Sequence, residues 1–203
     1  RRVLFRSDAS LRSIQERYPT LSEKQAREIL TMVSEATKGS DDRAELVVTA
    51  PPSFALRTKP TKVTVKAMLS DAEKSILITG YSLSDYFSEL IDCVIQKSQE
   101  GVFVKFFVND IESQNAFDHL CRYRGKFLRI YNYPKHEDKM SALHAKVISV
   151  DGEYTLITSA NLSYHGQEGN IELGTQIHSK DLAKQVDDVF TKLVFSKVFE
   201  EVI

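Results

Sequence analysis

One short stretch of the sequence combines a histidine and a lysine with the polar residues that phosphate chemistry needs. Residues 144–161 read HAKVISVDGEYTLITSAN, so His144 and Lys146 are two residues apart. Residues two apart on a β-strand point to the same face, so both side chains would project together if residues 143–150 form a strand. A fixed cation, neutral donors and a nucleophilic imidazole can bind and attack a phosphate without a metal. The spacing predicts phosphodiester cleavage through a phosphohistidine.

A hairpin is expected to bring the second half of this stretch back beside the first. Asp151 and Gly152 form a strong turn signal, and residues 154–159 have the pattern of a returning strand. That strand ends at Ser159, and Asn161 follows, so a hydroxyl and a carboxamide can approach the imidazole. We predict a structural role for Asp151 and Gly152, because an aspartate in a turn commonly caps its own backbone.

These residues resemble the signature of the phospholipase D superfamily, which reads H-x-K-x4-D, then G-S-x-N, then N-x-E. The matching residues are His144, Lys146, Asp151, Ser159, Asn161, Asn170 and Glu172. Thr158 stands where the family usually has glycine. The resemblance implies an α/β fold, with a mixed β-sheet flanked by helices on both faces, and hydrolysis without a metal or other cofactor.

The resemblance also implies a role for each candidate catalytic residue. His144 would attack phosphorus or protonate the leaving oxygen, while Lys146 and Asn161 would hold the non-bridging oxygens. Ser159 would add a hydroxyl contact. Glu172 would accept a hydrogen bond from the imidazole and so fix its tautomer and orientation.

The proposed reaction needs two histidines, one neutral to form the covalent intermediate and one protonated to act as general acid. Only His144 stands in a complete H-x-K-x4-D motif; the other histidines are His119, His136, His165 and His178. Small family members with a single motif pair two copies across a twofold axis, so we expect a homodimer with one composite active site. Activity should have a bell-shaped pH dependence, because each end of the range removes one required protonation state.

A basic segment suggests the substrate. Residues 121–146 carry seven arginines and lysines against two acidic residues, with aromatic residues interleaved. Nucleic-acid grooves combine charge neutralisation and base stacking in this way. We predict that Arg122, Arg124 and Lys126 bind DNA, single- or double-stranded, and that His165 and Asn170 also contact the substrate. A solvated helix face followed by a half-buried strand would give the same mixture, and the sequence leaves both open.

Composition excludes several classes of protein. The 203 residues have a formal net charge of −1, which argues against a uniformly basic nucleic-acid coat. No apolar run approaches the ~18 residues of a membrane span, so we expect a cytoplasmic protein that does not bind membranes. Cys93 and Cys121 are too few for a disulfide framework. Residues 119–121 and 136–138 could be read as metal ligands, but each set is too small to close a coordination shell.

The pattern of elements changes near residue 40. A capping box at residues 20–23 and a helical stripe on either side predict an N-terminal helical extension over residues 1–40. Residues 41–203 alternate between strand and helix patterns typical of βαβ units, and we expect them to form the catalytic domain. The predicted strands are 45–49, 75–79, 102–108, 127–131, 143–150, 154–159 and 171–178, and the predicted helices are 62–69, 85–99, 113–124 and 180–195.

A narrower resemblance covers most of the chain from about residue 10. Residues 46–52, 76–82, 101–105, 143–146, 159–163 and 170–174 resemble the phospholipase D-like component of DISARM anti-phage defence systems. This resemblance implies a nuclease that restricts invading DNA, with other proteins of the same system as partners. Two alternatives stay open: a DNA-binding subunit with little turnover, and a phospholipase, although no amphipathic membrane-docking segment is evident.

Overall fold

The computed structural model describes residues 2–36, 42–51, 57–80, 88–113, 117–134 and 141–203. Two compact units make up the chain, Arg1–Asp42 and Arg43–Ile203. The boundary predicted at residue 40 lies outside the described residues. No helix in these ranges is both long enough and apolar enough to cross a membrane.

The first unit is a pair of helices, α1 (Arg2–Arg17) and α2 (Glu23–Ala36). A capping box begins α2: Gln25 N donates to Ser22 Oγ at 3.3 Å, and Ser22 N donates to Gln25 Oε1 at 2.9 Å. The sequence predicted this cap at residues 20–23. That prediction is wrong by two residues, because the first helical residue is Glu23.

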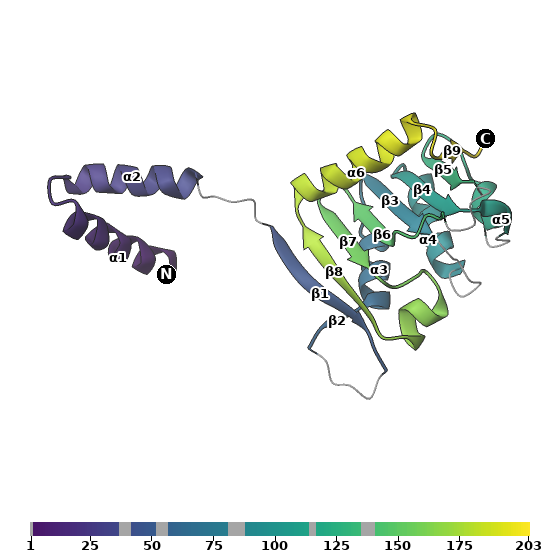
Figure 1. The fold of residues 1–203 in the computed structure, drawn as a ribbon, viewed down its shortest axis with the longest axis horizontal. Helices are drawn as coiled ribbons and strands as arrows, with labels where there is room; N and C mark the ends of the chain where they lie inside the picture. The colour runs from purple at the N-terminus through teal and green to yellow at the C-terminus, as the bar shows by residue number, and fades with distance from the viewer. Residues whose placement is uncertain (1, 37–41, 52–56, 81–87, 114–116, 135–140) are drawn as a thin grey trace. The chain divides into compact units, whose positions relative to one another are not determined.

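The second unit is built on a mixed sheet. Among the described residues it has nine strands in the order β2-β1-β8-β7-β6-β3-β4-β5-β9 (Figure 1). The strands are β1 (Arg43–Thr49), β2 (Lys59–Pro60), β3 (Ser75–Gly80), β4 (Phe103–Asn109), β5 (Leu128–Tyr133), β6 (Val147–Val150), β7 (Tyr154–Thr158), β8 (Glu172–His178) and β9 (Glu200–Glu201). Strands β3, β4 and β5 are parallel, whereas β6, β7 and β8 each pair antiparallel with their neighbours.

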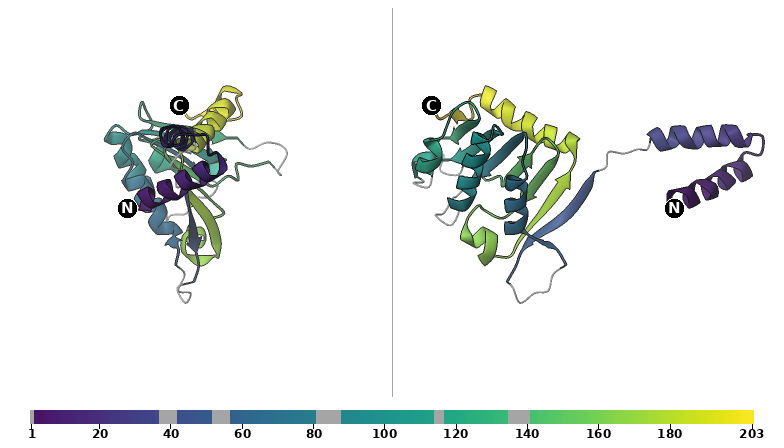
Figure 2. Two further views of the ribbon diagram at one scale, coloured as in Figure 1. Left: turned by 90° about the vertical axis from the view of Figure 1, so that its left-hand side faces the viewer. Right: turned by 180° about the vertical axis from the view of Figure 1, so that it is seen from behind.

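Helices cover both faces of this sheet (Figures 1 and 2). Helices α3 (Thr61–Ser70), α4 (Ser88–Gln99) and α5 (Phe117–Cys121) pack over a large core on one face, and α6 (Lys180–Phe195) covers a smaller cluster on the other. Alternate residues of one strand serve the two faces. Phe106 belongs to the large core, whereas Phe107 packs against Tyr131 and Phe190, with ring centroids 5.0 and 4.6 Å away. The predicted fold class is therefore confirmed.

Two predicted elements are shorter in the structure. The helix predicted at 113–124 is reduced to α5, of which residues 117–121 are described as helical, and Arg124 Nη1 donates to Cys121 O at 2.7 Å at its end. The strand predicted at 143–150 begins only at Val147. The sequence analysis did not predict the two-residue strands β2 and β9, the short turn η2 (Ile111–Ser113) or the π-helical turn η3 (His165–Gly169).

Candidate active site

The H-x-K-x4-D motif runs along strand β6, so its two ends lie at opposite ends of the strands of the sheet. Strand β6 pairs antiparallel with β3, so that Ile148 faces Ile78 and Val150 faces Ile76. The start of β6 therefore lies where β3, β4 and β5 end, here called the carboxyl edge. The end of β6 lies where those three strands begin, here called the amino edge.

Side chains at the carboxyl edge hold the backbone that carries His144 and Lys146. Leu143 N donates to Asn109 Oδ1 at 2.8 Å. Thr79 Oγ1 donates to Ala145 O at 2.7 Å and accepts from Val147 N at 2.9 Å. Because these side chains take the place of a neighbouring strand, the first four residues of the predicted strand are not part of the sheet.

Lys146 is buried at this edge, whereas His144 is exposed. Lys146 is only 8% exposed to solvent. Its Nζ donates to His144 O at 2.8 Å. Burial lowers the pKa of the Lys146 ammonium group, and the negative charge of Glu172 partly opposes that shift. The structure thus places a buried cation directly beneath the backbone of the exposed imidazole.

Glu172 joins the other candidate residues to this cation. Ser159 Oγ donates to Glu172 Oε2, and Asn170 Nδ2 donates to Glu172 Oε1 at 3.0 Å. Leu173 N in turn donates to Ser159 Oγ at 3.2 Å. Ser159, Asn170 and Glu172 therefore form one hydrogen-bonded group, and the negative charge of Glu172 acts on Lys146.

The threonine at the usual glycine position has a matching glycine on the next strand. Thr158 pairs with Gly174 across β7 and β8. A Cβ on Gly174 would lie 2.7 Å from the Cβ of Thr158, a distance that forces one of them to move. Thr158 Oγ1 also accepts from Ala160 N at 3.1 Å. Space for the threonine is therefore provided by Gly174, which sequence reasoning missed although the glycine was visible two residues after Glu172.

Asn161 lies beneath the η3 turn. Its backbone oxygen accepts from Gln167 Nε2 at 3.1 Å, and its side-chain Oδ1 is buried with no hydrogen-bond partner among the described residues. Gly166 makes this close packing feasible, because a Cβ there would lie 2.3 Å from Asn161 O. His165 is exposed at the start of η3.

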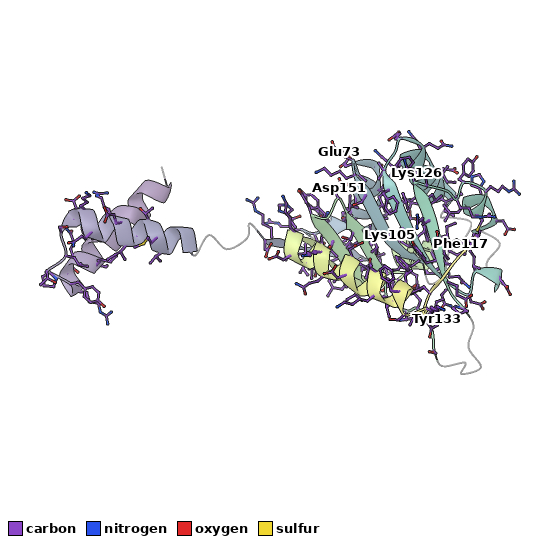
Figure 3. All side chains as sticks on the ribbon, turned by 90° about the horizontal axis from the view of Figure 1, so that it is seen from above. Glu73, Lys105, Phe117, Lys126, Tyr133 and Asp151 are labelled. Atoms are coloured by element: carbon purple, nitrogen blue, oxygen red, sulfur yellow. The ribbon has the colours of Figure 1, made fainter. Side chains whose placement is uncertain are left out.

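The basic segment predicted to bind substrate lies at the amino edge, away from His144. Leu128 faces Val104 near the start of β4, and Val104 N donates to Phe127 O at 2.7 Å. The seven residues of β4 span roughly 20 Å between the two edges. In Figure 3, Lys126 lies at the same end of the strands as Asp151, and Tyr133 lies at the opposite end. The structure does not bring Arg122, Arg124 and Lys126 together with His144, and we leave them out of the proposed site.

Asp151 also lies at the amino edge, where backbone amides surround its carboxylate. The carboxylate accepts hydrogen bonds from the backbone N–H of Lys74 at 2.7 Å, of Ser75 at 2.9 Å and of Glu73 at 3.0 Å. Burial by itself would raise the pKa of Asp151, but these backbone donors together outweigh burial and lower it. The carboxylate thus holds the start of β3, instead of capping only its own turn. Gly152 follows in the turn with a φ of +67°.

A second histidine–lysine pair with the same spacing, His178 and Lys180, also lies at the amino edge. The His178 ring stacks on Tyr154 with centroids 4.6 Å apart, and Lys180 Nζ lies 3.1 Å from Glu153 Oε1. Gln185 stands where the motif requires aspartate.

The described ranges contain no group of three or more histidine, cysteine and acidic side chains arranged to hold a metal ion. His119 Nε2 lies 3.2 Å from Asp92 Oδ1 in an exposed ion pair. Residues 136–138, the other metal candidate of the sequence analysis, lie outside the described residues.

Comparison with known proteins identifies the family. The model of the family described as "Cardiolipin synthase, PLD-like domain" matches residues 65–194, which include the whole group around Lys146. The chain belongs to this phospholipase D-like family. Within the phospholipase D-like proteins, it is 32% identical to the DISARM protein DrmC of Bacillus paralicheniformis over 198 residues, which cover 95% of this chain and 81% of that protein.

Solved structures of phospholipase D-like proteins share the fold. Nuc from Salmonella typhimurium, a phospholipase D family member, has a TM-score of 0.61 at 17% identity, covering 80% of this chain and 99% of that chain. NucT from Helicobacter pylori has a TM-score of 0.63 at 16% identity, covering 77% and 98%. At this level of identity the likeness concerns the fold alone.

Proposed function

We propose that the protein is a metal-independent phosphodiesterase that cleaves DNA through a phosphohistidine at His144. The observation that carries this proposal is the arrangement at the carboxyl edge, in which the buried Lys146 donates to the backbone oxygen of the exposed His144 and the charge of Glu172 acts on Lys146. An ammonium group shielded from water attracts a phosphate more strongly than an exposed one does. The likeness to the DISARM protein DrmC supports DNA as the substrate and defence against invading DNA as the setting.

In the first step of the proposed reaction, a ring nitrogen of His144 attacks phosphorus and forms a nitrogen–phosphorus bond. The bond between phosphorus and one ester oxygen breaks, and the departing oxygen takes a proton from a second, protonated histidine. In the second step that histidine, now neutral, removes a proton from water. The water oxygen attacks phosphorus and releases His144, which restores both imidazoles.

The other residues of the group stabilise charge and position the imidazole. Lys146 and Asn161 hold the non-bridging oxygens, whose negative charge grows in the transition state, and Ser159 contributes a hydroxyl group. Glu172 orients the imidazole of His144 and also favours the charged form of Lys146, whose pKa burial lowers. His165 and Asn170 contact the substrate at the border of the site.

The second histidine comes from a second copy of the chain. We propose a homodimer whose twofold axis brings two His144 side chains to one phosphate. An exposed apolar strip at the start of β8 supports this arrangement: Ile171 is 78% exposed and Leu173 is 58% exposed, and they flank Glu172 in the sequence, on the face of the sheet opposite its side chain. Leu46 on β1 and Ile157 on β7 extend the strip, because both pair with Thr175 of β8, which lies between them. Contiguous exposed apolar surface of this kind marks interaction sites.

The dimer has its own test. Leu173→Glu places a charge in the apolar strip and is expected to give monomers with little activity, as measured by light scattering and cleavage assays. Val189→Glu is the matched control, because Val189 is similarly exposed, at 53%, but lies on α6. A monomeric wild-type protein that cleaves DNA would contradict the composite site.

The proposed activity is tested with purified protein and labelled single- and double-stranded DNA in excess EDTA. Cleavage should persist in the wild type and fall by at least about 10⁴-fold in His144→Ala. His119→Ala is the matched control, because it removes an exposed histidine on α5 and should cleave as the wild type does. DNA binding without cleavage in every protein would favour the subunit that binds DNA with little turnover. Release of lipid headgroups without DNA cleavage would favour a phospholipase.

The proposed setting follows from the same assignment. A nuclease that restricts invading DNA would act in the cytoplasm, and other proteins of the defence system are its expected partners.

A further inference from the structure

A cavity lies next to the η3 turn, and Gln167 and Glu168 of this turn line it. Its volume is about 500 Å³. Its walls come from the end of β1, from the start of α3 and from η3, which pack against one another. The residues of the wall that bear on its chemistry are Thr49, Pro51, Val63, Tyr164, Gln167 and Glu168.

The cavity and the candidate active site share a wall. Thr49 lines the cavity and pairs directly with Glu172 across β1 and β8, and such partners have Cα atoms about 4.5–5.5 Å apart. Gln167 lines the cavity as well, and its Nε2 donates to Asn161 O at 3.1 Å. Thr49 Oγ1 donates to Gly166 O at 2.9 Å, which fixes η3 against β1. A strand whose phosphate is held by Lys146 and Asn161 would therefore pass close to the cavity.

The lining fits a planar, partly polar ring. Tyr164 is 48% exposed and offers an aromatic face, and Pro51 and Val63 add apolar surface. Gln167 is only 4% exposed, and its Oε1 has no hydrogen-bond partner among the described residues. Leaving a buried acceptor unpaired costs free energy. Because Oε1 itself is buried, a ligand reaches it only when the Gln167 amide turns toward the cavity; the amino and imino groups on the edge of a nucleobase can then donate to it, whereas an acyl chain offers no donor.

We propose that this cavity receives one unstacked base of the DNA strand, next to the phosphate that is cleaved. This inference rests on the proposed function, and it specifies the substrate as single-stranded or locally unpaired DNA. Stacking on Tyr164 holds the ring, and Gln167 binds its polar edge. A base inside a duplex is already stacked and paired, so duplex DNA is cleaved more slowly.

The experiment uses the full chain and a set of single-stranded oligonucleotides that are cut at one defined bond. In each oligonucleotide one nucleotide near that bond is replaced by an abasic nucleotide, which keeps the phosphate and loses the base. One position should reduce kcat/KM by about tenfold, within the range of about 5- to 150-fold that loss of one base–aromatic stack produces. The remaining positions should change kcat/KM much less.

A variant that occupies the cavity completes the test. In Val63→Trp the sensitive position should lose its effect, so that the abasic and normal strands are cleaved at the same rate. Val189→Trp, a substitution at an exposed valine of α6, should keep the tenfold difference, and circular dichroism checks that both variants fold.

Different failures have different meanings. If the wild type cleaves every abasic strand at the same rate, or cleaves duplex as fast as single strands, the inference about the cavity is overturned and the proposed function stands. If the sensitive position persists in Val63→Trp, the base is bound elsewhere and the inference is likewise overturned. If the wild type cleaves none of the strands, the proposed function itself fails.

Discussion

The two edges of the sheet carry the two ends of one sequence motif, and they differ in what their polar groups contact. At the amino edge, the carboxylate of Asp151 accepts from three backbone amides at the start of β3. At the carboxyl edge, the buried Lys146 donates to the backbone oxygen of the exposed His144, and Ser159 donates to Glu172, whose charge acts on Lys146. The motif therefore combines a structural aspartate, which binds the start of β3, with a reactive site at the other end of β6.

The largest expected effect is at the carboxyl edge. Lys146→Met keeps the volume of the side chain and removes its charge, so cleavage should fall by about 10³-fold, as expected when a group that stabilises the transition state is lost. Stability should change little, because methionine packs well in a buried position. Single-turnover cleavage and urea unfolding measure the two quantities.

The matched control is Lys105→Met, which removes a lysine that pairs with Asp187 at 2.7 Å on the α6 face of the sheet. It should cleave DNA within about twofold of the wild type, because it removes a partly exposed ion pair that lies away from His144. Comparable losses of activity in both variants would mean that Lys146 has no special part in the chemistry.

The next largest effect is at the amino edge and concerns stability. Asp151→Asn weakens three hydrogen bonds to a charged acceptor and should lower the free energy of unfolding by about 2–3 kcal/mol. The folded protein should retain its cleavage rate, because Asp151 lies at the other end of β6. If Asp151→Asn were as stable as the wild type but inactive, Asp151 would act in catalysis and not in stability.

The hydrogen bonds to the Asp151 carboxylate also predict a dependence of stability on pH. The folded-state pKa of Asp151 lies below its ordinary value of 3.8, so the carboxylate stabilises the fold above that value and loses this contribution as the pH falls through the lower folded-state pKa. The difference in stability between the wild type and Asp151→Asn should therefore narrow below about pH 4. Urea unfolding across pH 2.5–7 measures it, and a constant difference would exclude the charge as the cause.

The smallest effect is expected for the basic segment. The double variant Arg122→Gln with Lys126→Gln removes two exposed charges near the amino edge, and kcat/KM for a short oligonucleotide should change by less than about twofold. A loss above tenfold, with a weaker dependence on salt concentration, would show that DNA also contacts this edge.

The sequence predicted the sheet and its flanking helices because buried strands have continuous apolar patterns, as in β3 and β4. It did not predict the path of residues 143–146, because their backbone is held by Asn109 and Thr79, whose side chains arrive from distant strands. The same limit explains the basic segment. The basic segment is close to His144 in the sequence, which suggested a shared groove. Strand β5, however, lies between them and runs from the amino edge to the carboxyl edge.

The candidate site divides in a similar way. Spacing and the predicted hairpin indicated His144, Lys146, Ser159 and Asn161, and family resemblance added Asn170 and Glu172. The link from Glu172 to Asn170 and Ser159 required coordinates, since it joins the loops on both sides of η3. The reciprocal pairing of Thr158 with Gly174 depended on the register of β7 and β8, which no local pattern specifies.

The covalent intermediate tests the central claim most directly. Protein mixed with a DNA substrate in excess EDTA is denatured in alkali during turnover, because phosphohistidine survives there, and the modified residue is mapped by mass spectrometry. We expect a phosphodiester adduct on His144 in the wild type and none in His144→Ala. Rapid cleavage with no adduct, an adduct on another residue, or cleavage that requires a divalent metal would contradict it.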